Sequence, residues 1–285
     1  MVEDKTAILV ADVKAVLGEG PIWVQRHQAL HWVDIKGRKI FRRSFEGDLR
    51  SWETPLRICS LAPRESGGFI AGTENGLAWV DPENGRYELF ADPEPERPTN
   101  RFNDGKVDRQ GRFWAGTMDD AELEASGALY PLAAALQPQR VDDGYKVTNG
   151  PAFSPDGRIM YHNDSALQIT YAFDLDETGG ASNRRVFLKF SEGDGYPDGM
   201  TVDAEGCLWI AFWDGWCVRR FSPEGALLET LKVPTARPTS CAFGGPDLDH
   251  LFISSAAIGL DGPDAGGLFL ARPGARGIEE RPFAG

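Results

Sequence analysis

Apolar and polar positions along this chain alternate in short blocks that are typical of β-strands joined by turns. In the segment VDAEGCLWIAFW, a short strand is followed by a polar turn with Asp203 and Gly206, and then by an almost wholly apolar strand. VDRQGRFWAGTM and FSPDGRIMYHND repeat this order, and three weaker copies complete the series. The six copies begin at Trp23, Ala62, Val107, Phe153, Val202 and Phe243.

Most copies continue into a third strand and another turn, as in GLAWVDPENGRYELF. A unit of four antiparallel strands that recurs about every 45 residues is the signature of a propeller blade. The 33 glycines and 19 prolines suit the many turns of such a fold. Helix should be scarce, because the helix-forming run DAELEASGALYPLAAAL is interrupted by Gly127 and Pro131. We predict an all-β fold, a six-bladed β-propeller with four-stranded antiparallel blades, as a single domain over residues 1–285.

The charge balance is acidic, with 30 Lys and Arg against 43 Asp and Glu and a net charge of −13. Nucleic acid is therefore not an expected partner, because a phosphate-binding surface needs a basic excess. The chain has no apolar run near the ~20 residues of a membrane span. Its N-terminus lacks the basic start and apolar centre of a signal peptide. We expect a cytoplasmic protein without membrane contact, as a monomer or small homo-oligomer.

Several enzyme classes lose support because their motifs are absent. The four cysteines have no Cys-x-x-Cys spacing and are expected to be buried thiols, not disulfides or zinc ligands. The four histidines form no His-Glu-x-x-His pattern, and the chain has neither a Gly-x-Ser-x-Gly motif nor a phosphate-binding loop. These absences argue against zinc proteases, serine hydrolases and nucleotide-dependent enzymes. The cysteines are Cys59, Cys207, Cys217 and Cys241.

The repeat indicates where chemistry should lie. In a propeller the innermost strands line a central channel, so residues just before each first strand converge on one end of it. Uneven spacing of about 40 to 50 residues between these positions is consistent with insertions in the turns. The six positions are Glu19, about Ser60, Asn103, Asn149, Asp198 and about Ser240–Cys241.

Carboxylates brought together in a channel repel one another unless a cation lies among them. Glu19, Asn149 and Asp198 offer only oxygen atoms, which favours one hard divalent ion whose charge balances the two carboxylates. Taken singly, Asn149 and Asp198 would be ordinary Asx-Gly turn formers. Their matching places in the repeat, together with a glutamate that no turn requires, favour the metal site. Ligand type does not select among Ca²⁺, Zn²⁺, Mg²⁺, Mn²⁺ and Fe²⁺.

The chain resembles the gluconolactonase/regucalcin, or senescence-marker-protein, family of six-bladed propellers over nearly its whole length. The segments that carry the resemblance are LGEGPIW, RFNDGKVDRQGRFWAGTM, SNRRVF, YPDGMTVDAEGCLW, SCAFGGPDL and the closing FAG. The resemblance implies a metal at Glu19, Asn149 and Asp198, with substrate contacts from Arg101 and Asn103. One position departs from the family, because Ala121 stands where a substrate-contacting glutamate is expected. Asp119, Asp120 and Glu122 are the candidates to replace it.

The activity that the resemblance implies is metal-dependent hydrolysis of a sugar-acid lactone to the free acid. Glucono-, xylono-, arabinono- and galactonolactone are all possible substrates, since they differ by one hydroxyl orientation or one carbon. Asp198 is the expected general base for the attacking water. Among the aromatic residues, most tryptophans are expected in the core. Trp216, Tyr145 and Lys146 are kept as candidates for the rim of the site.

Two other readings remain open. Related six-bladed propellers include phosphotriesterases and aryl-ester lactonases, which rely on channel histidines, but no histidine falls at a blade mouth here. A calcium-binding regulatory protein or an interaction scaffold would need no turnover. Arg101 and Asn103 favour an enzyme, because a pure metal site or docking surface gives no reason for them beside the channel.

Overall fold

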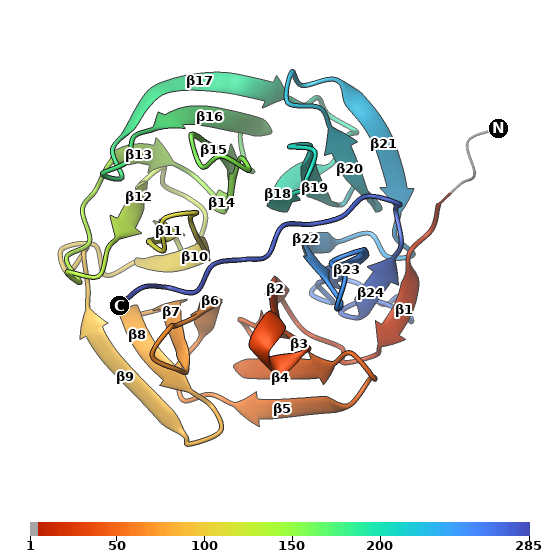
Figure 1. The fold of residues 1–285 in the computed structure, drawn as a ribbon, viewed down its shortest axis with the longest axis horizontal. Helices are drawn as coiled ribbons and strands as arrows, with labels where there is room; N and C mark the ends of the chain where they lie inside the picture. Colours follow the sequence, from red (N-terminus) through yellow and green to blue (C-terminus); the bar gives the residue numbers. More distant parts are fainter. Residues whose placement is uncertain (1–4) are drawn as a thin grey trace.

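The computed structural model describes residues 5–285 and confirms the predicted architecture, with the first four residues of the predicted domain outside this part. Six four-stranded antiparallel sheets surround a central channel (Figure 1). The only helical element between residues 5 and 285 is a 3-10 turn, η1 (Gln25–His27). In the same range no helix is long and apolar enough to cross a membrane.

Blades one to five each contain four strands that follow one another in the chain, from the channel outward. Blade one contains β2 (Gly18–Val24), β3 (Ala29–Asp34), β4 (Lys39–Ser44) and β5 (Leu49–Glu53), and blade two contains β6 (Ile58–Pro63), β7 (Phe69–Thr73), β8 (Gly76–Asp81) and β9 (Arg86–Ala91). Blade three contains β10 (Asn100–Val107), β11 (Phe113–Asp119), β12 (Gly127–Leu132) and β13 (Asp142–Tyr145). Blade four contains β14 (Thr148–Phe153), β15 (Ile159–Asp164), β16 (Ile169–Leu175) and β17 (Ala181–Lys189), and blade five contains β18 (Tyr196–Val202), β19 (Leu208–Trp213), β20 (Cys217–Phe221) and β21 (Leu227–Lys232).

Blade six joins the two ends of the chain. Its three inner strands are β22 (Pro238–Gly244), β23 (His250–Ser255) and β24 (Leu268–Ala271), and its outermost strand is β1 (Ile8–Ala11) from the N-terminal region. The ring is therefore closed by backbone hydrogen bonds between segments more than 250 residues apart. Ring closure leaves no innermost strand without a neighbouring blade on each side.

In blades three and five, an aspartate stabilises the repeated turn through hydrogen bonds. The Asp203 carboxylate accepts hydrogen bonds from the backbone of its own turn and from the indole N–H of Trp209, at 2.9 Å. Asp108 does the same for the indole of Trp114, at 2.8 Å. The spacing of six residues between aspartate and tryptophan therefore ties the turn to the buried second strand, and it fixes the hairpin in register.

The hydrophobic core is divided among the six interfaces between blades. Each of the six clusters of buried apolar side chains lies mainly between two adjacent blades, as where Trp209 of blade five meets Phe243 of blade six, and the cluster between blades two and three also includes Ile22 of blade one. Their rings are perpendicular, with centroids 5.8 Å apart. The tryptophans expected in the core include Trp32, Trp114 and Trp209, which are all fully buried. All four cysteines are buried and free, as predicted.

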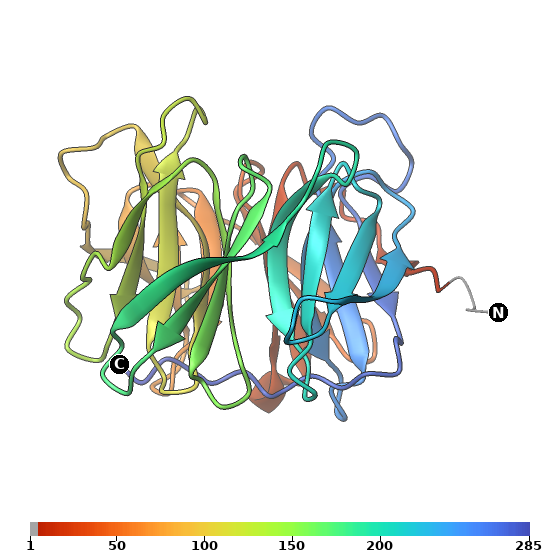
Figure 2. The same ribbon diagram turned by 90° about the horizontal axis from the view of Figure 1, so that it is seen from above.

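The last residues of the chain form a strap across one end of the channel (Figures 1 and 2). It hydrogen-bonds to the turns between the first and second strands of four blades, at Glu65, Gly111, Ala204 and Leu248. Glu280 of the strap lies 3.5 Å from the Lys106 ammonium and 3.6 Å from Arg109. The strap therefore crosses the end of the channel where these turns lie.

Phe283 anchors the strap, because its ring is fully buried between blades two and three and lies 6.1 Å from the ring of Trp79. We predict that Phe283→Ala lowers the free energy of unfolding by about 3–5 kcal/mol, as large-to-small core substitutions do. Urea unfolding followed by tryptophan fluorescence measures this change. Arg281→Ala, an exposed neighbour, is the control and should stay within about 0.5 kcal/mol of the native protein. A Phe283→Ala protein as stable as this control would contradict the anchoring role.

Candidate active site

A register shift interrupts the pairing of every innermost strand with the second strand of its blade. Such a bulge bends the strand and redirects its side chains. Glu19, Asn103, Asn149 and Asp198 lie at or next to these shifts in β2, β10, β14 and β18. They are therefore part of the innermost strands, and the prediction that placed them just before each first strand was wrong by a few residues.

These side chains open into one cavity of about 490 Å³ at the end of the channel opposite the strap. Its other walls include the turns between the second and third strands, which lie at the far ends of the strands from the turns that the strap contacts. The five residues predicted from sequence as metal ligands or substrate contacts all line this cavity. They are Glu19, Arg101, Asn103, Asn149 and Asp198.

Two of the carboxyl groups in the cavity are buried, with Glu19 and Asp198 each 5% exposed. Burial and the charge of Asp104 raise the pKa of Glu19 to about 8. Burial, Glu19 and Asp104 raise the pKa of Asp198 well above its usual range. The Oδ1 atom of Asp198 has no hydrogen-bond partner within residues 5–285. A group of buried acids that disfavour one another's ionisation is typical of a functional site.

Asp104 is a third buried acid that the sequence analysis missed. Its carboxylate accepts hydrogen bonds from the backbone N–H of Gly105 at 2.8 Å and of Gly150 at 2.9 Å. Burial raises its pKa to about 6, and the nearby Lys106 ammonium opposes that rise. A signal was available, because the Asp-Gly pair at 104–105 repeats the pair at 198–199.

A chain of hydrogen bonds connects the predicted substrate contacts to the predicted metal ligand Asn149. Arg101 Nη1 donates to Asn103 Oδ1 at 2.7 Å, and Asn103 Nδ2 donates to Asn149 Oδ1 at 3.0 Å. Asn149 Nδ2 in turn donates to Ser165 Oγ at 2.8 Å. Each amide is thereby fixed in one orientation, with the oxygen of Asn149 on the side of Asn103.

Arg101 is a buried residue, since only 5% of its side chain is exposed. Its Nε donates to Asp120 at 2.6 Å, and Asp120 also accepts from Arg57 at 2.9 Å. The two arginines lower the pKa of Asp120, although its partial burial opposes them. Asp120 therefore orients the Arg101 guanidinium at the cavity wall, and a solvated surface position for Arg101 is excluded.

The loop around Ala121, where the family glutamate is expected, contributes two acidic side chains to the cavity. Asp120 and Glu122 line it, whereas Ala121 and Asp119 do not. The Asp119 carboxylate instead accepts hydrogen bonds from the backbone of its own loop, at Leu123 and Glu124. Of the three candidates to replace the glutamate, Asp119 is therefore in the wrong place.

Among the rim candidates, only Lys146 lines the cavity. Trp216 is 55% exposed and lies outside it, and Tyr145 is buried in the core against blade four. Most tryptophans are expected in the core, but Trp213 lines the cavity. It is the last residue of β19 and the only one in that strand that is not fully buried.

A family model described as SMP-30/Gluconolactonase/LRE-like region matches residues 17–257. The chain belongs to this family. The resemblance predicted from sequence is therefore confirmed. The matched residues include every predicted site residue and the first strands of all six blades.

Relatives and solved structures match over nearly the whole chain. Regucalcin from Danio rerio is 39% identical over 95% of this chain and 96% of its own length. A 6-deoxy-6-sulfogluconolactonase from Pseudomonas putida is 36% identical over 99% of this chain and 100% of its own length. A solved calcium-binding protein, regucalcin, from Agrobacterium tumefaciens has a TM-score of 0.93 at 27% identity and covers 98% of this chain and 97% of its own.

The donor atoms of this SMP-30-type cavity fit a hard divalent cation. Glu19 and Asp198 supply carboxylate oxygens, and Asn149 supplies an amide oxygen. The Oδ1 atom of Asp198 is buried where no donor of residues 5–285 reaches it. A doubly charged ion would offset both the burial and the mutual repulsion that raise the pKa values of Glu19 and Asp198. The fit rests on oxygen ligands alone, which is the set that Ca²⁺, Mg²⁺ and Mn²⁺ prefer.

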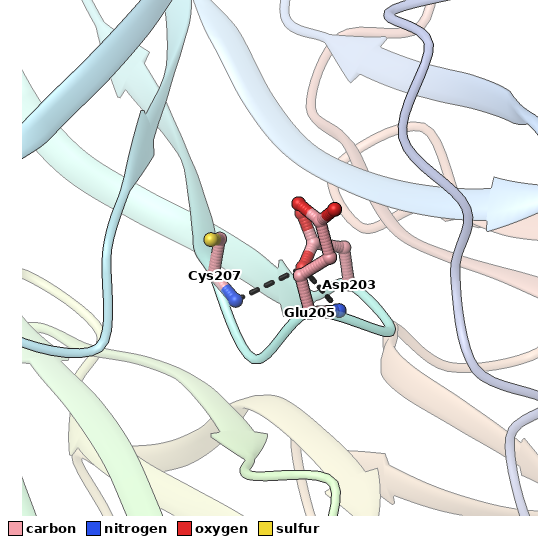
Figure 3. Close-up of side chains that lie close together, drawn as sticks. All are labelled: Asp203, Glu205 and Cys207. Carbon is pink, nitrogen blue, oxygen red and sulfur yellow. Dashed lines mark hydrogen bonds between the residues drawn. The ribbon is translucent and has the colours of Figure 1, made fainter.

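A second group of metal-type side chains lies in the turn between β18 and β19, formed by Asp203, Glu205 and Cys207 (Figure 3). The Asp203 Oδ1 atom accepts the backbone N–H groups of Glu205 and Cys207, and Oδ2 accepts from Trp209 and Arg220. Glu205 also pairs with Arg220. Since these oxygens are already hydrogen-bonded, the turn is structural, and the channel cavity remains the better metal site.

Proposed function

We propose that this protein is a metal-dependent hydrolase that opens a sugar-acid lactone to the free sugar acid. The observation that carries the proposal is the convergence of Glu19, Asn149 and Asp198 with Arg101 and Asn103 in one cavity, from four different blades. Names of relatives support the reaction class, since one is a sulfogluconolactonase. Lactonases are carboxylic ester hydrolases, because a lactone is an ester within a ring.

Glu19, Asn149 and Asp198 would hold the ion. When bound there, a divalent ion would polarise the lactone carbonyl and stabilise negative charge on its oxygen. Calcium is the first ion to test because a similar solved structure is described as a calcium-binding protein. Zn²⁺, Mg²⁺, Mn²⁺ and Fe²⁺ complete the series, since ligand type alone does not choose among them.

Asp198 is the proposed general base. Water attacks the carbonyl carbon, and the Asp198 carboxylate accepts the proton that this water loses. The bond between the carbonyl carbon and the ring oxygen then breaks. The proton passes from Asp198 to the departing ring oxygen, which becomes a hydroxyl group. The carbonyl carbon becomes the carboxyl group of the product, which releases the second proton of the water to solvent and leaves a carboxylate.

Arg101 and Asn103 are the proposed substrate contacts. The guanidinium can donate to sugar hydroxyls, and the amide of Asn103 can both donate and accept. The hydrogen bonds among Asp120, Arg101, Asn103 and Asn149 hold both groups in place before substrate arrives. Such positioning limits the loss of side-chain entropy on binding.

We predict that Arg101→Ala lowers kcat/KM for lactones by about 10- to 150-fold while bound metal remains stoichiometric. The reason is the loss of a charge-assisted contact, typically about 1.5–3 kcal/mol, by a residue that is not a proposed ligand. Steady-state lactone opening and elemental analysis provide the two readouts. Unchanged kinetics would remove Arg101 from the substrate site, and loss of the metal would move it to the metal site.

The decisive experiment is a panel of five- and six-carbon aldonolactones assayed with each metal in turn. A pH indicator reports acid release, with correction for spontaneous opening in buffer. If no lactone opens faster than buffer with any metal, a calcium-binding regulatory protein becomes the better proposal. Phosphotriester or aryl-ester hydrolysis has less support, because none of the four histidines of the chain, all within the described residues, lines the cavity.

A further inference from the structure

The cavity is unusually rich in basic residues for a chain in which acids outnumber bases by 43 to 30. Its lining has four basic and four acidic side chains. Two of the acids, Glu19 and Asp198, are the proposed ligands of a doubly charged ion, and Asp120 pairs with Arg101. The basic residues are Lys36, Arg101, Lys146 and Arg237, and the acidic ones are Glu19, Asp120, Glu122 and Asp198.

Two of the four basic residues have no ionic partner. Arg237 donates to Asp214 at 2.7 Å, so its charge is already paired. The ammonium groups of Lys36 and Lys146 make neither an ion pair nor a hydrogen bond within the described part of the chain. Lys36 is exposed, whereas Lys146 is half-buried. Of these two unpaired cations, Lys146 is therefore the one that water solvates less.

Hydrogen bonds hold the backbone of Lys146 in place, unlike that of a lysine in a mobile surface loop. Its N–H donates to the buried Asp164 carboxylate at 3.0 Å, and the next N–H donates to the same group at 3.2 Å. These bonds hold the residue just before β14, on the entrance side of Asn149. Arg101 lies on the entrance side of Asn103 in the adjacent blade three. Lys146 and Arg101 thus lie on neighbouring blades, outside the proposed metal ligands.

We propose that the substrate is a sugar lactone that carries an additional anionic group, and that Lys146 binds this group. The inference rests on the proposed function and specifies its substrate class. With the lactone carbonyl at the metal ligands and the sugar hydroxyls at Arg101 and Asn103, the end of the sugar remote from the carbonyl points toward the entrance. A carboxylate, phosphate or sulfonate at that end supplies the oxyanion that the Lys146 ammonium lacks. Lys36, across the entrance, adds long-range attraction.

The test compares four six-carbon lactones that differ only at carbon 6, which bears a hydroxyl, a carboxylate, a phosphate or a sulfonate. We expect the native enzyme with Ca²⁺ to have a kcat/KM at least about tenfold higher for one charged lactone than for the neutral one. Which charged lactone is preferred identifies the anion. Raising the salt concentration should reduce this preference, because salt screens the attraction.

The variant Lys146→Met should lower the ratio of charged-to-neutral kcat/KM by roughly 10- to 100-fold, and Lys146→Arg should restore much of it. Lys189→Met is the matched control, because Lys189 is exposed on the outermost strand β17, far from the cavity. A native preference for the neutral lactone, or a ratio unchanged by Lys146→Met, would overturn the inference.

A binding measurement keeps this inference separate from the proposed function. If no lactone is opened, calorimetry with the six-carbon sugar monoacid and diacid still tests the lysine, because these open-chain compounds differ by the second carboxylate alone. Tighter binding of the diacid that is lost in Lys146→Met would support the anion site even though hydrolysis had failed. Equal binding of the two acids would reject the site, whatever the hydrolytic activity.

Discussion

Asp198→Asn should lower lactone turnover by about 10²- to 10⁴-fold, which is the usual contribution of a general base. Asparagine is nearly the same size and still offers an oxygen to a metal, but it cannot accept a proton from water. Turnover should therefore fall much further than metal affinity. A residue that only shapes the bulge of β18 between Pro197 and Met200 would tolerate this change, because asparagine adopts irregular backbone conformations equally well.

Two measurements on the same preparation decide between these roles. Lactone opening by pH indicator gives turnover, and elemental analysis after dialysis gives bound metal. Retained metal with lost turnover supports both roles of Asp198, and joint loss leaves only the ligand role. Unchanged metal and turnover would show that the buried, unpartnered Oδ1 of Asp198 has no part in catalysis.

Much of the fold could be predicted because its determinants are local. The Asp-Trp turns of blades three and five lie within single hairpins, so the sequence carries them as a visible repeat. Two long-range contacts could not be predicted from these local patterns. β1 pairs with β24, and Phe283 packs between blades two and three, through contacts that span most of the chain. A local pattern has no information on such partners.

The site divides in the same way. Glu19, Asn149 and Asp198 repeat at matching places, so their convergence followed from the blade count. Asp104 was missed because Asn103, its neighbour, had already been assigned to that blade. The bulge in β10 turns both Asn103 and Asp104 toward the interior. The position of a bulge depends on pairing with the second strand, which the sequence alone does not give. Asp120 was only one of three candidates, since a loop conformation decides which acid reaches Arg101.

The pKa of Glu19 makes the stability of the metal-free protein dependent on pH. Its folded pKa of about 8 exceeds the unfolded value of 4.5, so the folded state holds a proton that the unfolded state has released. Raising the pH toward 8 therefore favours unfolding, by up to about 1.4 kcal/mol per pH unit for this one group. His31 and His162 act oppositely, since burial lowers both pKa values to about 3. Their effect is confined mostly to pH values below about 7, where unfolded histidine gains a proton.

Glu19→Gln should therefore have opposite effects on the metal-free and the metal-loaded protein. Without metal, the variant lacks a buried carboxyl that must ionise, so between pH 7 and 8 its melting temperature should exceed that of the native protein and fall less steeply with pH. With metal, it lacks one of two charged ligands, so affinity should fall by more than about 100-fold, beyond the loss typical of an outer-shell partner.

Thermal melts in chelator at pH 7 and 8, followed by Ca²⁺ titration of the same samples, measure both effects of Glu19→Gln. Glu224→Gln, an exposed acid in the turn after β20, is the control for the charge change alone. Native-like Ca²⁺ affinity in Glu19→Gln would remove Glu19 from the ligand set. A metal-free variant less stable than the native protein at pH 8 would mean that other groups of the protein already stabilise the negative charge of Glu19. The opposed signs are the specific expectation, because a residue retained only for packing would change both measurements in the same direction.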